Sequence, residues 1–284
     1  MLLDVISIGL NNFVNKTDVL SLAREYRDEI ELCEETNDDI SYIDLYVKKK
    51  DMTAALKNAV SEKLASLILT DYEDALMGRV ISANYFYFTA PEKKEIMQKA
   101  AGYLNRKKSD KLYNKKLKDI IYKKLCEYFE GENEIIVDGF VTFRLNDYKL
   151  EIGSIIDHAV DDYLVDREYK EFISLLKYFI SLQPVMFDNI NIIANEAGDY
   201  SIYDDRGGAV RVDFIDEQSG DFLYSELTRD DLLVSRLMTI APKSLVIHNR
   251  KYIKNKELLN TLMNIFENKL TFCNGCKMCA VCGK

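Results

Sequence analysis

The stretch that decides the fold is Asp147–Pro184, with the sequence DYKLEIGSIIDHAVDDYLVDREYKEFISLLKYFISLQP. Its apolar residues recur three and four positions apart, the spacing that places side chains on one face of an α-helix. These residues are Ile152, Ile155, Ile156, Ala159, Tyr163, Phe172, Leu176, Phe179 and Ile180. Pro184 ends the pattern, because proline lacks the amide hydrogen that a continuing helix needs. The stretch therefore predicts one long helix.

The sequence before this helix begins with strand patterns and then becomes helical. Leu2–Gly9 is an apolar run rich in Ile and Val, and residues 42–47 alternate as a half-buried strand does. A helical rhythm lies between these two strands. Helical patterns then run from Met52 to about Tyr103, with a new start at Pro91, and from Lys111 to Phe129. We predict an N-terminal β-α-β unit followed by a helical middle.

Strand patterns return after Pro184. Three short strands separated by turn residues predict a meander, at residues 190–193, 200–203 and 210–215. A helix capped by Thr228 and Asp231 follows and ends near Ile240. The last elements are a strand, a helix and a strand, at 244–248, 257–266 and 269–272. The fold class is thus α+β, with an N-terminal β-α-β unit, a helical middle, and a C-terminal meander plus a β-α-β unit.

The composition is that of an ordinary soluble protein. Apolar residues make up 48% of the 284 residues, and 38 Lys and Arg against 47 Asp and Glu give a net charge of −9. A chain of this length can bury a core without a disulfide or a metal. Met1–Leu10 carries Asp4 and no basic leader, which argues against a signal peptide, and no apolar stretch reaches the roughly 20 residues of a membrane span. We expect a cytoplasmic protein with reduced thiols.

The C-terminal sequence CNGCKMCAVC, residues 273–282, contains four of the six cysteines in overlapping C-x-x-C units. A C-x-x-C turn brings two sulfur atoms to one side, where both can bind one ion. Gly275 relaxes the backbone where the first turn is sharpest. Clustered thiolates repel one another unless a cation or protons compensate them. We therefore predict a metal site whose ligands are Cys273, Cys276, Cys279 and Cys282.

The spacing leaves the metal open between zinc and an iron–sulfur cluster. Zinc usually takes two C-x-x-C turns separated by a dozen or more residues, whereas only Lys277 and Met278 separate the outer turns here. The run is closer to the bacterial ferredoxin pattern C-x₂-C-x₂-C-x₃-C-P, but its last spacing is shorter and no proline follows. A two-cluster ferredoxin is excluded because there is no second cysteine run. Thiol redox chemistry and an ion-free tail remain alternative interpretations.

His248 is a further candidate ligand. If the strands at 244–248 and 269–272 are parallel neighbours joined by a right-handed crossover helix, both end at the same edge of the sheet. His248 then lies near Cys273 and can bind the metal or orient a ligand. The alternative is a purely structural histidine at a strand end.

A basic segment interrupts the acidic chain between Asn105 and Lys124, where nine basic residues stand against Asp110 and Asp119. Such a patch can bind a nucleic acid or an anionic surface. The candidate residues are Arg106, Lys107, Lys108, Lys111, Lys115 and Lys118. The same segment carries an apolar stripe, so an amphipathic helix with a solvated basic face is the simpler interpretation. We expect neither nucleic acid nor a membrane surface as the main partner, and nucleic-acid binding stays an alternative.

Catalytic motifs are absent from the sequence. It contains no Walker A, G-x-G-x-x-G, H-E-x-x-H or G-x-S-x-G motif. His158 has Asp161 and Asp162 at helical spacing, a pattern that can bind a cation but is common on solvated helix faces. We therefore predict no catalytic residues and favour a protein that is not an enzyme.

A set of segments carries a family resemblance: Gly139–Leu145, the stretch from Ile155 to Phe172, Leu175–Phe179 with Gln183, Ile240–Lys243, Val246–His248 and Leu259–Phe266. These segments resemble the YtxC-like sporulation proteins of endospore-forming bacteria. The resemblance covers about residues 135 to 273 and implies a role in spore formation, without implying a reaction or an active site. On this basis the chain divides into an N-terminal β-α-β and helical region (1–130), a YtxC-like region (131–272) and a cysteine-rich tail (273–284).

These observations predict a cytoplasmic sporulation protein that binds an unknown protein partner and carries a C-terminal site for zinc or an iron–sulfur cluster. A redox or iron–sulfur accessory protein or enzyme is the first alternative, and a nucleic-acid-associated protein using residues 105–124 is the second.

Overall fold

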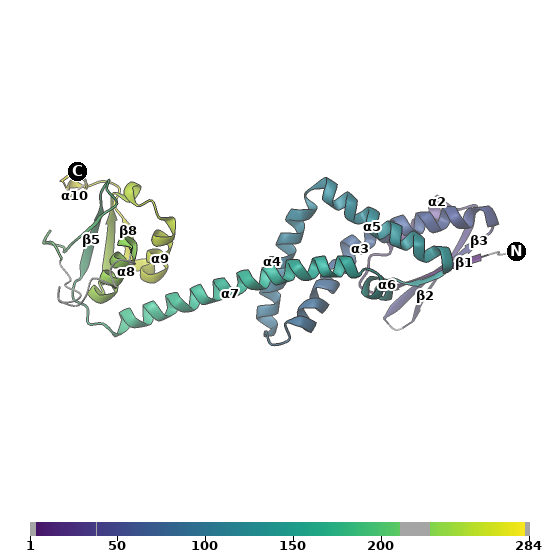
Figure 1. Ribbon diagram of the computed structural model, residues 1–284, viewed down its shortest axis with the longest axis horizontal. Helices are drawn as coiled ribbons and strands as arrows, with labels where there is room; N and C mark the ends of the chain where they lie inside the picture. Colours follow the sequence, from purple (N-terminus) through teal and green to yellow (C-terminus); the bar gives the residue numbers. More distant parts are fainter. Residues whose placement is uncertain (1–3, 38, 211–227, 282–284) are drawn as a thin grey trace. The chain divides into compact units, whose positions relative to one another are not determined.

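The computed structural model describes residues 4–37, 39–210 and 228–281 (Figure 1). They divide into two compact units between Val165 and Asp166. The fold is α+β, with strands towards both ends and a helical middle, as the sequence predicts. The two sets of strands form separate sheets, one in each unit. Each unit is described by itself below.

The sheet of the first unit has the strand order β2-β3-β1-β4. The strands are β1 (Asp4–Asn11), β2 (Ile30–Asn37), β3 (Ile40–Val47) and β4 (Glu134–Ile136). β1 pairs antiparallel with β3, β3 pairs antiparallel with β2, and β4 joins β1 in parallel. Alternate residues of β1 and β3 are fully buried, which explains the period of two in their sequences.

Helices complete the first unit around one core that also contains the buried strand residues. They are α1 (Thr17–Leu20), α2 (Leu22–Glu25), α3 (Thr53–Asn84), α4 (Ala90–Lys108), α5 (Lys111–Gly131), α6 (Val137–Arg144) and the first part of α7 (Asn146–Leu182), with a 3-10 turn at Lys50–Met52. α3 packs against both α4 and α5. α4 begins at a capping box of Thr89 and Glu92, with Pro91 in its first turn.

The sheet of the second unit has the order β6-β5-β7-β8. Its strands are β5 (Asn189–Ala194), β6 (Tyr200–Tyr203), β7 (Ser244–His248) and β8 (Leu270–Phe272). β5 and β6 form an antiparallel hairpin, whereas β5, β7 and β8 run parallel. The helices are α8 (Arg229–Ile240), α9 (Lys256–Phe266) and α10 (Lys277–Val281), and 3-10 turns lie at Arg250–Tyr252 and Glu267–Lys269.

The two faces of this second sheet differ in character. Ile192 and Ile247 lie in the apolar core together with Leu237 of α8 and residues of α9. Side chains alternate along a strand, so Asn191 and His248 point to the opposite face. The register pairs Asn191 with Val246 and Ile193 with His248, which places Asn191 and His248 diagonally across neighbouring strands. This polar pair positions the site described below.

Four helices and strands of the structure were not predicted: β2, β4, α6 and α10. The expected helix at 111–129, the capped helix after Thr228 and the strands at 190–193 and 200–203 are confirmed within one or two residues at each end. The third meander strand, at 210–215, lies outside the described residues except for Val210, whose amide donates to the Ile202 carbonyl at 2.8 Å.

Candidate metal centre

The carboxyl ends of β7 and β8 meet at one edge of the second sheet. The two strands run parallel, with Leu245 opposite Leu270 and Ile247 opposite Phe272, as predicted. The ladder extends one step further, because the Cys273 amide donates to the Ile247 carbonyl at 2.9 Å. The Arg250 guanidinium lies 4.4 Å from the centre of the Phe272 ring, which holds the end of β8 against the turn that follows β7. The chain therefore enters its cysteine-rich segment beside His248.

Sharp turns return the cysteines towards the sheet. Gly275 has φ +123°, a conformation that L side chains rarely adopt, which explains the glycine in the first C-x-x-C turn. Its amide points back and donates to Cys273 Sγ at 3.3 Å. α10 follows and carries Cys279, whose carbonyl accepts a hydrogen bond from the Asn249 side chain at 3.4 Å.

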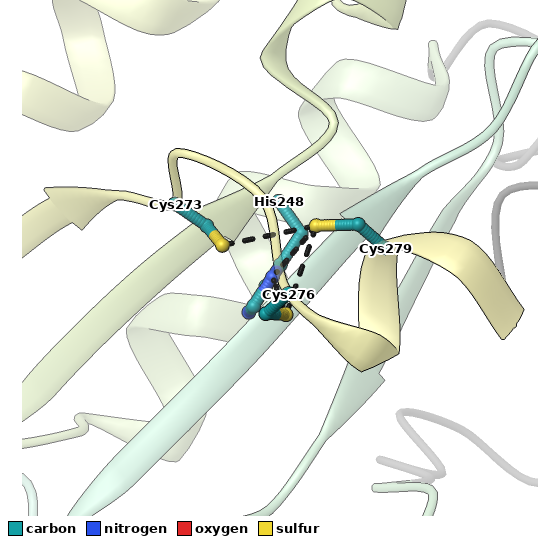
Figure 2. Close-up of side chains that lie close together, drawn as sticks. All are labelled: His248, Cys273, Cys276 and Cys279. Carbon is teal, nitrogen blue, oxygen red and sulfur yellow. Dashed lines mark hydrogen bonds between the residues drawn. The ribbon is translucent and has the colours of Figure 1, made fainter.

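One histidine nitrogen and three sulfur atoms converge at this edge (Figure 2). His248 Nδ1 lies 3.4 Å from Cys276 Sγ and 3.4 Å from Cys279 Sγ. Cys279 Sγ lies 3.8 Å from Cys276 Sγ and 3.7 Å from Cys273 Sγ. All four ligand atoms lie within 4.8 Å of one another, close enough to hold a metal ion. His248 thus joins three of the four predicted cysteines, and Cys282 lies outside the described residues.

The surroundings favour the ligand forms of His248 and Cys276. Burial lowers the pKa of the His248 imidazole, so the ring is neutral near pH 7 and keeps a lone pair for a metal. A hydrogen bond from the Cys279 backbone amide lowers the pKa of the Cys276 thiol and favours its thiolate. A neutral imidazole beside thiolates is a donor set that zinc and other borderline-soft ions bind.

Asn191 is a site residue that the sequence analysis missed. Its Oδ1 lies 3.0 Å from His248 Nε2, and its own amide nitrogen donates to the Asp204 carbonyl at 3.2 Å. Asn191 is only 8% exposed. The sequence already contained a signal for this role, because Asn191 interrupts the apolar run of the strand Asn189–Ala194. A polar side chain that is buried in a sheet needs a defined hydrogen-bond partner.

The basic segment in the first unit forms several ion pairs with acidic residues on neighbouring helices. Lys108 pairs with the buried Glu73 at 2.8 Å, Lys107 with Glu151 at 3.4 Å, and Lys118 with Glu62 at 3.4 Å. The Arg106 guanidinium lies 5.0 Å from the centre of the Tyr103 ring. Four of the six residues predicted as an anionic-ligand surface therefore have protein partners.

The other histidine, His158, with Asp161 and Asp162 at helical spacing, lies in a different environment. His158 stacks against the Tyr103 ring, with 4.8 Å between ring centroids. The Tyr103 hydroxyl donates to the Asp162 carboxylate. These contacts attach the long helix α7 to α4 through an aromatic residue, which is a packing role.

Comparison with known proteins identifies the family of this chain. The YtxC-like family model matches residues 58–271, which is more than half of the chain. The chain belongs to the YtxC-like family. A relative in Bacillus subtilis (strain 168), described as "Uncharacterized protein YtxC", is 22% identical over 230 residues that cover 79% of this chain and 79% of the relative. No solved structure matches.

The family match includes Asn191 and His248 and ends two residues before Cys273. The candidate metal centre therefore combines one ligand from the family region with ligands from the segment that follows it. Among the described residues, none of the helices of this YtxC-like protein combines the length and apolarity that a membrane crossing requires.

Proposed function

We propose that this YtxC-like protein binds a metal ion through His248, Cys273, Cys276 and Cys279 and acts as a non-catalytic binding protein. The observation that carries the proposal is the convergence of four donor atoms within 4.8 Å, supplied by a strand end and by a segment 25 or more residues further along the chain. Three thiolates in so small a space repel one another unless a cation or protons compensate their charge.

The donor set supports a binding role rather than catalysis. Four protein ligands complete the coordination of a four-coordinate ion, whereas catalytic sites keep one position open for water or substrate. An ion at this edge joins the end of β7 to the segment after β8, and it thereby stabilises the local fold that a protein partner contacts. The partner is a proposal that rests on this closed site and on the absence of catalytic sequence motifs.

The protein acts in spore formation, in the cytoplasm of the cell. The family resemblance supports the process, and the composition, which is that of an ordinary soluble protein, supports the compartment. The basic segment 105–124 gives less support to a nucleic-acid role, because much of its charge pairs with acidic residues of the same unit.

Metal content tests the proposal directly. Protein purified without oxygen should carry bound metal by elemental analysis, and the double variant Cys276→Ser/Cys279→Ser should carry none. Far-UV circular dichroism of that variant should stay nearly unchanged, because most of the helical residues belong to elements that lack these ligands. The matched control is Cys33→Ser/Cys126→Ser, which removes two thiols of the other unit and should keep the metal.

The same two double variants test the biological role. Introduced into the gene of the host organism, Cys276→Ser/Cys279→Ser should reduce the yield of heat-resistant spores and the control should not. Native wild-type protein that contains no metal and has all its thiols open to titration contradicts the proposal.

A further inference from the structure

We infer that the site holds a single tetrahedral Zn²⁺ ion, bound through Nδ1 of His248, and that Asn191 sets the orientation and tautomer of that histidine. The inference rests on the proposed metal-binding function and goes beyond it by naming the ion, the ligating nitrogen and a positioning residue. Three independent observations carry it: the spacing of the donors, the contacts of the imidazole and the way Asn191 is itself held.

The donor spacing fits one ion. In tetrahedral zinc sites Zn–S is about 2.3 Å and Zn–N about 2.0–2.1 Å, so the tetrahedron's edges are about 3.8 Å between sulfurs and about 3.5 Å between sulfur and nitrogen. The structure shows S···S separations of 3.7 and 3.8 Å and S···N separations of 3.4 and 3.4 Å. The remaining pairs stay within 4.8 Å.

An iron–sulfur cluster needs a different arrangement. A [4Fe–4S] cluster is bound by cysteines on separate irons, so the width of the cluster itself separates their sulfur atoms. A [2Fe–2S] cluster divides its ligands into two pairs on two irons. All four donor atoms here lie within 4.8 Å of one another, which leaves no room for the width of a cluster between them. The geometry therefore favours a mononuclear site over the cluster that the ferredoxin-like spacing suggested.

The two nitrogens of His248 have separate tasks. Nδ1 faces the sulfurs, with Cys276 Sγ and Cys279 Sγ both at 3.4 Å, whereas Nε2 faces the buried amide of Asn191. The Asn191 carbonyl oxygen accepts only from a protonated Nε2, which leaves Nδ1 unprotonated with its lone pair towards the ion. A metal-bound histidine whose other nitrogen donates to a protein acceptor is a recurring arrangement in zinc sites.

Asn191 cannot reverse its amide without losing a hydrogen bond. Its nitrogen donates to the Asp204 carbonyl at 3.2 Å, so its oxygen is the atom left to face His248. Asp204 in turn is held in the β-turn after β6, where its carboxylate accepts from the amides of Arg206 at 3.0 Å and Gly208 at 2.6 Å. The hairpin of β5 and β6 thus fixes the histidine before a metal arrives.

Cobalt(II) substitution tests the coordination. Full-length protein, freed of metal with a chelator and reductant under anaerobic conditions, is titrated with Co²⁺. We expect the intense visible bands of tetrahedral cobalt and thiolate-to-cobalt charge transfer, both saturating at one equivalent and both lost when Zn²⁺ is added. Saturation at two equivalents, weak octahedral bands, or iron with inorganic sulfide in the protein as isolated would overturn the inference while leaving metal binding intact. A protein that binds no metal defeats the proposed function instead.

The role of Asn191 has its own measurement. Asn191→Ala should weaken Zn²⁺ and Co²⁺ binding by about 10- to 100-fold, the usual effect of losing such a partner. The control is Asn189→Ala on the same strand, whose side chain accepts from the Ser244 hydroxyl at 2.9 Å, and it should change the affinity less than twofold.

Long-range ¹H–¹⁵N correlation spectra of the zinc-bound protein require no substitution at the metal site itself. They should show a protonated Nε2 and a metal-bound Nδ1 for His248, with His158→Gln assigning the signals of the second of the two histidines. A metal-bound Nε2, or an Asn191→Ala affinity equal to that of the wild type, contradicts the assignment.

Discussion

At the scale of single residues, the first unit contains a buried charge pair that the sequence did not reveal. Glu73 is 7% exposed and accepts from Lys108 Nζ at 2.8 Å and from the Tyr148 hydroxyl. Lys108 also donates to the Leu69 carbonyl at 2.7 Å. The sequence placed Lys108 on a solvated basic face, because its partners lie 35 or more residues away and only the packing of α3, α4 and α7 unites them.

Lys108→Met should lower the free energy of unfolding by about 3 kcal/mol, because it leaves the Glu73 carboxylate buried without its cation. The neighbouring Lys107→Met is the control. Its ion pair with Glu151 is partly exposed, so the loss should be under about 1 kcal/mol. Urea denaturation followed by circular dichroism measures both changes. Equal effects of the two variants would show that the buried pair contributes no more to stability than the partly exposed pair.

At the scale of elements, α8 illustrates a helix whose start was predicted from sequence. The Thr228 hydroxyl accepts from the Asp231 amide at 3.2 Å, and the Asp231 carboxylate accepts from the Thr228 amide at 3.0 Å. Thr228→Ala should lower the free energy of unfolding by about 1 kcal/mol, the usual contribution of an N-cap side chain. Hydrogen exchange of the α8 amides should then speed up by about fivefold. Ser235→Ala, at an exposed position within the same helix, should leave exchange unchanged or slower.

The same cap predicts a dependence on pH. Hydrogen bonds from the Thr228 hydroxyl and amide lower the pKa of Asp231 below its ordinary value. The carboxylate therefore contributes stability that is complete above the unfolded pKa of about 3.9 and is lost as the pH falls through the lower folded value. Asp231→Asn should accelerate α8 exchange at pH 7 and have less effect near pH 2. An undiminished effect at pH 2 would contradict the carboxylate's role.

How far the sequence predicts an element depends on whether that element buries a periodic face. α5 and β3 each bury such a face, and the sequence predicts the ends of both elements within about two residues. β2 is almost entirely exposed, so its sequence IELCEETN carries no apolar alternation, and it becomes a strand only by pairing with β3. β4 is three residues long and gains its partner β1 from the other end of the unit. Such elements depend on tertiary pairing that local sequence does not encode.

The candidate site was predictable to a similar extent. C-x-x-C spacing identified the thiols, and the rule for parallel crossovers placed His248 beside Cys273. The choice between zinc and a cluster was not accessible from spacing, because it depends on how closely the donors converge in space. Asn191 was missed since its role follows from the register between β5 and β7.

At the scale of the whole molecule, the boundary between the units falls within α7, where the charged stretch Asp166–Glu171 separates the apolar residues Tyr163 and Phe172. The helix itself continues through this stretch, so the sequence analysis assigned one helix and no boundary there. The division at residues 130 and 272 follows family likeness and cysteine content, and it stays a prediction. The four ligand residues identified in the structure all belong to the second unit. Metal binding should consequently stabilise the two units unequally.

Removing the metal should destabilise the second unit alone. A ligand that binds only the folded form adds RT ln(1 + [L]/Kd), about 4 kcal/mol when free Zn²⁺ is 1,000 times its Kd, and that energy is lost on chelation. Hydrogen exchange should accelerate in β5, β7 and β8 and stay unchanged in β1 and β3. Cys33→Ser/Cys126→Ser with zinc present controls for thiol loss in the first unit. Equal acceleration in both sheets would mean that the units unfold as one cooperative body, and that the metal stabilises the whole protein.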